Sequence, residues 1–457
     1  MGDYTADHSH TWKTTDDEGS FGVDFGTHLD NWSGGHELRL EQEHKSLPLK
    51  TAGAFIIFDI SPDAEGGDEM EENTAYSHSL SPSAWNRWET CPRQYWLSRQ
   101  GLPRKTGIAA SLGTAVHASI EDLVQLDLSG MEDSESGWLP EKAEQRLQAR
   151  WEEEREIFEN TPRHGDWKQE NISKARIQQA GALEMLLTHA GVPKLSPTRV
   201  TVALWKRVMS LVLAAEGELR TKDGKLMGRL DLLLAEIDEK GAIVGWVVAD
   251  LKTGRPPAPD LKPEVVRQLL LYRDIIISNN PNPPPIRAEG WYTDNSTTYL
   301  AEGEPVIEQA YAAWESTKPG SIPLKPTPGK DSCGGFCDWK AWCPHWWSWR
   351  QQEGSLHVGD FVDAVVLLHA YEPSTGSASI ELCEPADSLG RVMPTGRTIP
   401  AVFKGRATKL LESLLAEDFQ GPLYLGGVLT NARSWRIGSW CDVLPWDPIP
   451  ESGRADG

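Results

Sequence analysis

The sequence has no long apolar run. No apolar segment approaches the roughly 20 residues that a membrane-spanning helix requires. The N-terminus is acidic and contains histidine, whereas a secretory signal would be basic and then apolar. These two absences predict a cytoplasmic protein with no membrane partner.

Several motifs of nucleotide and acyl chemistry are also missing. The sequence contains no Gly-x4-Gly-Lys-Ser/Thr loop for the phosphates of ATP and no Gly-x-Gly-x2-Gly loop for a dinucleotide. No serine lies in the Gly-x-Ser-x-Gly turn that presents a nucleophile. An ATP-driven motor is therefore not expected on this chain, and dinucleotide or serine-nucleophile chemistry has no support.

Positive charge is scarce relative to negative charge. The 457 residues include 45 Lys or Arg and 67 Asp or Glu, which gives a formal net charge of -22. The excess is uneven, because residues 1–75 carry 17 acidic residues against four basic ones. These residues also lack helical or strand periodicity. We therefore expect residues 1–75 to be a disordered acidic extension, with Met70 as an alternative start of translation.

Helical patterns begin near residue 80. Ser81 can cap a helix that runs from Trp85 to Gln100, with a proline tolerated in its first turn. In a second helix, after Gly113, His117 and Glu121 lie four residues apart and so share one face. Amphipathic helical patterns follow at about residues 141–158 and 172–190.

Three apolar segments separated by tight turns come next. They cover residues 211–220, 225–237 and 242–251, and the turns contain Asp-Gly and Lys-Gly pairs. Glycine supplies the positive backbone angle that such hairpin turns need, so we expect an antiparallel meander. Residues 243–249 show little polar alternation, which indicates that the third strand is covered on both faces.

Charged side chains lie on the second and third of these strands. Asp250 and Lys252 are two residues apart and project from the same face, where the third strand enters a proline-rich loop. Asp231, on the adjacent strand, can come near Asp250. In isolation such an Asp-x-Lys is more often a surface ion pair than a catalytic pair. A helix at residues 263–278 follows, and it presents Gln268 and Tyr272 on one face.

Five loose motifs in this order make the pattern specific. Together they resemble the PD-(D/E)XK nuclease superfamily, and within it the RecB-type nucleases that include AddB-like and CRISPR-associated iron-sulfur exonucleases. The resemblance covers roughly residues 80–345. The motifs are Ser81-Pro82-Ser83 with Cys91-Pro92, Leu112-Gly113-Thr114-Ala115-Val116-His117, Gly228-Arg229-Leu230-Asp231, Asp250-Leu251-Lys252-Thr253-Gly254, and Gln268 with Tyr272.

The resemblance implies an α/β restriction-endonuclease-like core, with a central mixed sheet flanked by helices, and a metal-dependent active site. Lys252 would position or activate the attacking water, and Gln268 and Tyr272 would support the site or contact DNA. Glu121 is a further candidate beyond the metal ligands. Hard oxygen ligands favour Mg²⁺, and a histidine ligand also suits Mn²⁺. The implied metal ligands are three side chains and one backbone carbonyl: His117, Asp231, Asp250 and Leu251.

A basic and aromatic cluster lies in the first helical motif. Positive charges bind phosphate and flat rings stack on bases, so this mixture suits a surface that binds a DNA strand. An equally good interpretation is a solvated helix whose aromatic residues face the core. The candidates for DNA binding are Arg87, Arg93, Tyr95 and Trp96.

The six cysteines include a compact trio, Cys333-x3-Cys337-x5-Cys343. Disulfides are a poor explanation for it in a cytoplasmic protein. The resemblance implies that Cys91 joins the trio as the fourth ligand of a 4Fe-4S cluster. Spacing alone leaves a zinc ion or unligated thiols open. The remaining cysteines lack cysteine neighbours and are expected to be buried apolar residues: Cys383 and Cys441.

The C-terminal part reads as short strands with one helix. The strands are expected near residues 359–370, 377–383, 397–403, 423–429 and 435–443, and the helix at 407–417. A five-stranded barrel with one helix would be OB-like and would bind single strands, whereas a small all-β domain for protein contacts is the alternative. We therefore expect a nuclease domain with an iron-sulfur site at residues 76–350 and a small β-domain at 355–450.

The combined pattern predicts a metal-dependent DNA nuclease, specifically an exonuclease that acts on DNA ends or single strands in recombination, repair or defence. A separate helicase or recombination protein is a candidate partner. The alternative is a catalytically inactive iron-sulfur DNA-binding scaffold, or a subunit of a helicase-nuclease complex. The presence of Asp231, Asp250 and Lys252 together favours catalysis, because an inactive site need keep none of them.

Overall fold

The structure is a computed structural model that describes residues 78–320, 323–334, 337–353, 357–358, 361–431 and 434–450. The expected acidic extension at residues 1–75 and the alternative start at Met70 lie outside the described residues. Within the described part of the chain, no helix is long and apolar enough to cross a membrane.

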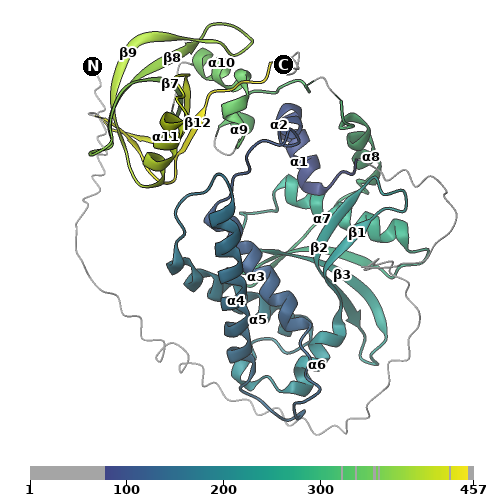
Figure 1. Cartoon of the computed structure of the whole chain (residues 1–457). Coiled ribbons are helices and arrows are strands. Elements are labelled where there is room, and N and C mark those ends of the chain that lie inside the picture. Colours follow the sequence, from purple (N-terminus) through teal and green to yellow (C-terminus); the bar gives the residue numbers. More distant parts are fainter. Residues whose placement is uncertain are drawn as a thin grey trace, which may run out of the picture. The chain divides into compact units, whose positions relative to one another are not determined.

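Five strands form the first sheet, in the order β1-β2-β3-β4-β5 (Figure 1). Neighbouring strands are antiparallel except for the parallel pair β3 and β4, so the sheet is mixed. Gly224 and Gly241 adopt positive φ angles of 67° and 80°, as hairpin turns require, and the predicted meander is confirmed. The strands are Val212–Arg220, Met227–Ile237, Ile243–Lys252, Ile286–Tyr292 and Thr297–Leu300.

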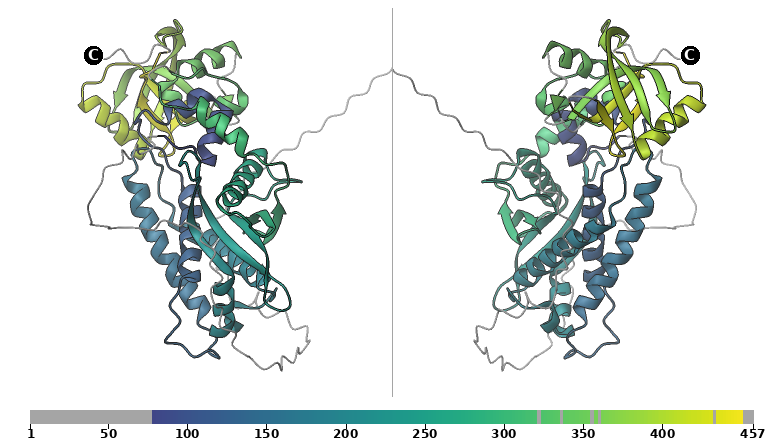
Figure 2. Two further views of the ribbon diagram at one scale, coloured as in Figure 1. Left: turned by 90° about the vertical axis from the view of Figure 1, so that its right-hand side faces the viewer. Right: turned by 90° about the vertical axis from the view of Figure 1, so that its left-hand side faces the viewer.

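Helices cover both faces of this sheet, as Figures 1 and 2 show. Helices α3, α5 and α6 share one core with the sheet, and α1, α7 and α8 share another core with its opposite face. Helix α4 packs on α3. This arrangement confirms the restriction-endonuclease-like fold class. The helices are α1 Pro82–Thr90, α3 Ile108–Val124, α4 Leu139–Asn160, α5 Ile172–His189, α6 Val202–Leu211, α7 Pro263–Asn279 and α8 Ile307–Ser316.

The helix expected from Trp85 to Gln100 is in fact two helices, so the prediction of one continuous helix was wrong. Helix α1 ends at Thr90, and α2 spans Pro92–Leu97. Pro92 disfavours helical backbone at the preceding residue, and Cys91 is extended with φ -163° and ψ 112°. The break places a cysteine between two helices that point in different directions (Figure 1).

The C-terminal strands form a closed barrel. The ring runs β7-β8-β9-β11-β10 and closes by pairing of β10 with β7; β9 and β11 are parallel. Helix α11 (Arg406–Ala416) connects β9 to β10, so the five-stranded ring is accompanied by one helix. The strand expected at residues 435–443 is divided into β11 and β12 by a turn. The strands are β6 His357–Val358, β7 Phe361–Glu372, β8 Ser377–Pro385, β9 Val392–Phe403, β10 Leu423–Thr430, β11 Trp435–Ile437 and β12 Asp442–Pro445.

The barrel shares its hydrophobic core with segments that precede it. Trp96 and Leu97 of α2, together with Trp346 and Trp347 of α10 (Pro344–Gln352), pack in the same core as the barrel strands. The tryptophans of α2 and α10 are therefore part of a hydrophobic core. Both cysteines outside the expected ligand set are buried, as the sequence predicts: Cys383 and Cys441.

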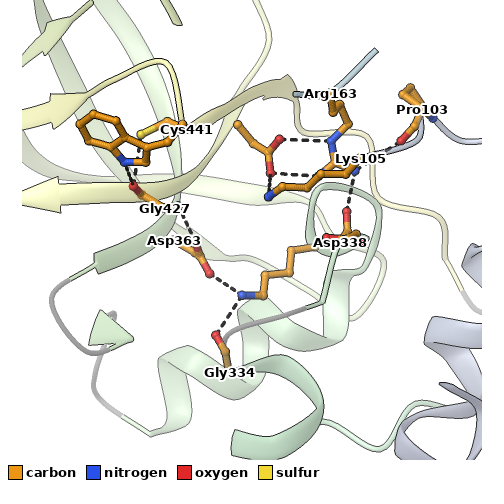
Figure 3. Close-up of polar contacts among 11 residues, drawn as sticks. Pro103, Lys105, Arg163, Gly334, Asp338, Asp363, Gly427 and Cys441 are labelled. Carbon is orange, nitrogen blue, oxygen red and sulfur yellow. Dashed lines mark hydrogen bonds and ion pairs between the residues drawn. The ribbon is translucent and has the colours of Figure 1, made fainter. Parts of the chain in front are cut away.

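A buried carboxylate connects the barrel to residues before the sheet. Asp442 Oδ2 of β12 accepts hydrogen bonds from Arg163 Nη2 at 2.9 Å and from Lys105 Nζ at 2.8 Å (Figure 3). Arg163 also donates to the carbonyl of Asp338 at 2.7 Å, close to the cysteine trio. Arg163 and Asp442 are 5% and 8% exposed, so this ion pair is buried and unlike the exposed pairs on the helices.

Replacing Asp442 with Asn is expected to lower the free energy of unfolding by about 3 kcal/mol, because Arg163 would remain buried without a carboxylate partner. Urea titration of the full chain measures this change. The matched control, Asp133→Asn, breaks an exposed pair with Lys206 and should change stability by less than about 1 kcal/mol. Equal losses in the two variants would contradict the prediction.

The same pair makes stability depend on pH. Burial raises the pKa of Asp442, but Lys105 and Arg163 lower it more, and the net pKa lies below the usual range. The contribution to stability is therefore present above the unfolded carboxyl pKa of about 4 and is lost as the pH falls through the lower folded value. The stability difference between the parent and Asp442→Asn should shrink below about pH 4.

Candidate active site

Strand pairing brings the two predicted aspartates together. Strands β2 and β3 pair with Leu232 opposite Ala249, which places Asp231 opposite Asp250. Asp231 Oδ2 accepts a hydrogen bond from the backbone N–H of Leu251 at 2.6 Å. Asp250 is only 3% exposed, so its carboxylate lies in a dry environment at the end of a buried strand.

Helix α3 places His117 beside these strands. His117 Nδ1 lies 3.2 Å from Asp231 Oδ1 and 3.7 Å from Glu216 Oε1. The helix comes close to the end of β3 because Gly113 has no side chain: a Cβ there would lie 3.1 Å from Thr253 Oγ1. The predicted neighbourhood of His117 and Asp231 is therefore present.

Glu216 is a site residue that the sequence reasoning missed. It lies on β1, where the pairs Ala215 with Leu232 and Gly217 with Leu230 leave it opposite Asp231. Its φ of 49° is unusual for a residue other than glycine, and strained backbone of this kind often occurs at functional sites. The signal available in the sequence was weak, because β1 carries two glutamates, Glu216 and Glu218, and nothing in the sequence distinguishes them.

These side chains fit a divalent metal ion. Within the described residues, the three groups that bring one ligand atom each within 4.8 Å of one another are His117, Glu216 and Asp231. Asp250 Oδ2, buried nearby, pairs with Lys252 Nζ at 2.5 Å. Carboxylates and one imidazole are a suitable donor set for Mg²⁺ or Mn²⁺.

Lys252 is held by a chain of contacts on the face of the sheet that α7 covers. Its Nζ pairs with Asp250 and donates to Gln268 Oε1 at 3.2 Å. Gln268 Nε2 in turn lies 2.9 Å from Asp250 Oδ1 and 3.0 Å from the hydroxyl of Tyr272. Both α7 residues expected from the sequence therefore contact the site, and Gln268 fixes the Asp-x-Lys pair in one arrangement.

The electrostatic field of the site is negative. Burial lowers the pKa of His117, but Asp231 and Glu216 outweigh this effect and the pKa rises to about 10. Burial and the charge of Asp231 raise the pKa of Asp250 to about 6, against the influence of Lys252. Burial, and then Glu216, also raise the pKa of Glu121, which places that candidate within reach of the site.

Gly228 makes room for Tyr272. A Cβ at Gly228 would lie 2.4 Å from Tyr272 Cε1, so the Gly-Arg-Leu-Asp motif needs glycine at its first position. The variant Gly228→Ala is expected to destabilise the protein by about 1–3 kcal/mol and to displace Tyr272 from Gln268. Gly254→Ala is the matched control, because no atom lies within 4 Å of a Cβ there. Thermal unfolding that is unchanged in both variants would argue against this packing.

The four predicted cluster ligands lie in one region. Cys91 and Cys333 are close enough to interact electrostatically. Cys333, Cys337 and Cys343 are also close enough to interact with one another. Burial raises the pKa of the Cys343 thiol to about 11 and raises that of Cys337 further. Thiols in such surroundings stay protonated unless a metal replaces the proton.

Two buried cations border these thiols. Arg93 is fully buried, donates to the carbonyl of Ile449 and lowers the pKa of Cys343. Lys340 is 3% exposed and donates to the carbonyl of Gly334 and to Asp363 Oδ2 (Figure 3). Lys340 is already paired with Asp363, whereas the buried charge of Arg93 beside Cys343 fits a negatively charged metal-thiolate group.

The structure contradicts part of the predicted DNA-binding set. Arg93, Tyr95 and Trp96 are 0%, 2% and 9% exposed, because α2 is packed between the two cores. Buried side chains cannot contact a strand on the surface. Arg87 is half-buried and borders a pocket with Gln94 and Arg267, so it remains a candidate.

A mixed sheet covered by helices, with carboxylates and a lysine on adjacent strands and a histidine on a helix beside them, defines a restriction-endonuclease-like protein. The family model of the PD-(D/E)XK nuclease superfamily matches residues 79–344, which is more than half of the chain. The chain therefore belongs to the PD-(D/E)XK nuclease superfamily, whose members are generally nucleases that use divalent metal ions. A comparison with curated proteins gave no match.

Proposed function

We propose that this protein is a metal-dependent DNA exonuclease of the RecB type that hydrolyses phosphodiester bonds at ends or in single strands. The observation that carries the proposal is the meeting of Asp231, Asp250 and Lys252 with His117 at one end of the sheet. Because the chain has no phosphate loop for a motor, a separate helicase or recombination protein would supply the ends.

The proposed metal ligands are His117, Asp231, Asp250 and the Leu251 carbonyl, with Glu216 added by the structure. These residues would hold a Mg²⁺ or Mn²⁺ ion, which would supply polarisation of the scissile phosphate and a lower pKa for water. Lys252 donates hydrogen bonds toward the charge that develops on the phosphate oxygens and helps to position the attacking water.

The surrounding residues prepare Lys252 for this role. Gln268 and Asp250 restrict the position of its ammonium group, so little reorganisation is needed during the reaction. Glu216 is itself oriented by Arg229, whose Nε lies 2.7 Å from Glu216 Oε2. Tyr272 supports Gln268 from the far side, which completes a set of contacts from α7 to the metal ligands.

We further propose that Cys91, Cys333, Cys337 and Cys343 bind a 4Fe-4S cluster. A tetrahedral zinc site would bring four sulfurs to about 3.8 Å from one another, given Zn–S bonds of about 2.3 Å. Within the described residues, no three cysteine sulfurs lie within 4.8 Å of one another. The wider spacing favours a cluster of several iron atoms over a single ion.

Cleavage of end-labelled DNA tests the proposed activity. Protein purified anaerobically is incubated with linear and circular single strands and with linear duplex, in Mg²⁺, Mn²⁺ or EDTA. An exonuclease should degrade the linear molecules with either metal ion, leave circles intact and be inactive in EDTA. Cleavage of circles would replace the exonuclease with an endonuclease, and activity in EDTA would exclude the proposed mechanism.

A further inference from the structure

Trp440, in the turn between β11 and β12, is 53% exposed. Its indole N–H donates to the carbonyl of Gly427 at 2.9 Å, and the ring lies against Gly438, where a Cβ would be 2.3 Å from Trp440 Cζ3. The ring is thus fixed while about half of its surface faces solvent. A large, rigid and exposed aromatic surface is typical of stacking platforms for bases.

A pocket of about 310 Å³ lies beside this ring. Ile108 and Phe158 contribute apolar side chains to it, and Lys105, His164 and Lys168 contribute groups that can carry positive charge. Lys168 is exposed and the side chain of Lys105 is 37% exposed, so both can reach a ligand. Asp166 is the exposed carboxylate among the lining residues.

The buried ion pair described above contributes to the wall of the pocket. Arg163 and Asp442 both line it, and the Arg163 guanidinium also lies 5.3 Å from the ring centre of Trp342. Contacts from the barrel, from the loop after α4 and from the cysteine region therefore hold its shape. A preformed pocket binds a ligand with little loss of conformational entropy.

Helix α3 connects this pocket to the catalytic residues. Ile108, its first residue, lines the pocket, and His117 follows nine residues later on the same helix. At 1.5 Å per residue the two positions are about 14 Å apart along the helix axis. A stacked strand advances about 3.4 Å per nucleotide, so this interval corresponds to about four nucleotides.

We propose that this pocket binds an unpaired base of single-stranded DNA, stacked on Trp440, with neighbouring phosphates on Lys105 and Lys168. The proposal rests on the proposed function, since it assigns the pocket to the strand that leads to the nuclease site. An aromatic ring can stack on a base of the single strand, and the cationic groups can bind its phosphates. A duplex keeps its bases stacked inside and offers no flat face to the ring.

Binding is measured by fluorescence anisotropy with a labelled twelve-nucleotide oligothymidylate in EDTA, which prevents cleavage. Trp440→Ala should weaken binding about tenfold, while Trp440→Phe, which keeps an aromatic ring, should stay within about threefold of the parent. Lys168→Glu should weaken binding and reduce its dependence on salt. Met393→Ala, an exposed residue of β9 outside the pocket, is the matched control and should bind like the parent.

The site itself is located by cross-linking of an oligonucleotide that carries 5-iodouracil, followed by peptide mapping. A cross-link to the peptide that contains Trp440 supports the proposal, and a cross-link confined to other peptides overturns it. Unchanged oligothymidylate binding by Trp440→Ala also overturns it, as does an equal loss of duplex binding. Because binding is measured without metal, a protein that binds in this way but never cleaves would refute the nuclease function and leave the pocket assignment standing.

Discussion

Asp250→Asn is expected to reduce the rate of DNA cleavage by about 10³-fold or more while the protein stays folded. The substitution removes one negative charge from the metal site and the carboxylate that holds Lys252 at 2.5 Å. Both effects act on the charge that develops during hydrolysis, so the loss should appear in kcat more than in KM. Single-turnover cleavage of end-labelled DNA in Mg²⁺ measures it.

The matched control is Asp260→Asn, which changes an exposed carboxylate in the loop after β3 and should leave cleavage unchanged. Lys252→Ala should be nearly as inactive as Asp250→Asn, whereas Lys240→Ala, in the exposed turn before β3, should cleave like the parent. DNA binding in EDTA and thermal unfolding are measured for each variant, so that a folding defect is separated from a loss of chemistry. An Asp250→Asn enzyme with more than a tenth of the parent rate would contradict the assignment.

Cys343→Ser is expected to abolish absorbance near about 400 nm and to remove most of the bound iron and sulfide. Because the cluster is bound only by folded protein, its loss should also lower the midpoint of thermal unfolding markedly. Arg93 would then remain buried beside a neutral side chain at position 343, without the negative charge that a bound cluster would supply. Spectra, metal analysis and thermal unfolding of the full chain measure these effects independently of DNA cleavage.

Cys383→Ser provides the control, since Cys383 is buried in the barrel as an apolar residue and should retain the full spectrum and iron content. Colourless protein that contains one zinc ion per chain would reject the cluster in favour of a zinc site. Protein with neither metal, whose stability does not depend on Cys343, would mean that the thiols are only packed.

The central part of the site could be predicted because it depends on short stretches of sequence. A strand places Asp250 and Lys252 on one face whatever surrounds it, and one turn of helix does the same for Gln268 and Tyr272. The antiparallel meander of β1, β2 and β3 followed from apolar segments divided by glycine turns, whereas the mixed sheet was implied by the family resemblance. Side-chain direction along a strand or a helix depends only on neighbouring residues, and the structure has these side chains on the expected faces.

The predictions that were missed or wrong concern residues whose positions depend on contacts between distant segments of the chain. Glu216 joins the site through strand pairing and an unusual φ angle, neither of which a motif shows. Arg93 and Trp96 were candidates for a DNA-binding surface because they belong to a basic and aromatic cluster. The elements that cover them lie more than 200 residues later in the chain. Whether a helix face meets solvent or a core is decided by partners that the local sequence does not reveal.

The break at Cys91 and Pro92 also bears on how the molecule unfolds. Trp85 of α1 packs in the core next to α7, while Leu97 of α2 packs in the core of the barrel. Cys91 lies at the junction of these two cores, and its expected co-ligands follow more than 240 residues later. A cluster bound there would make the two cores melt in a single cooperative transition, and its loss would let calorimetry resolve them as two.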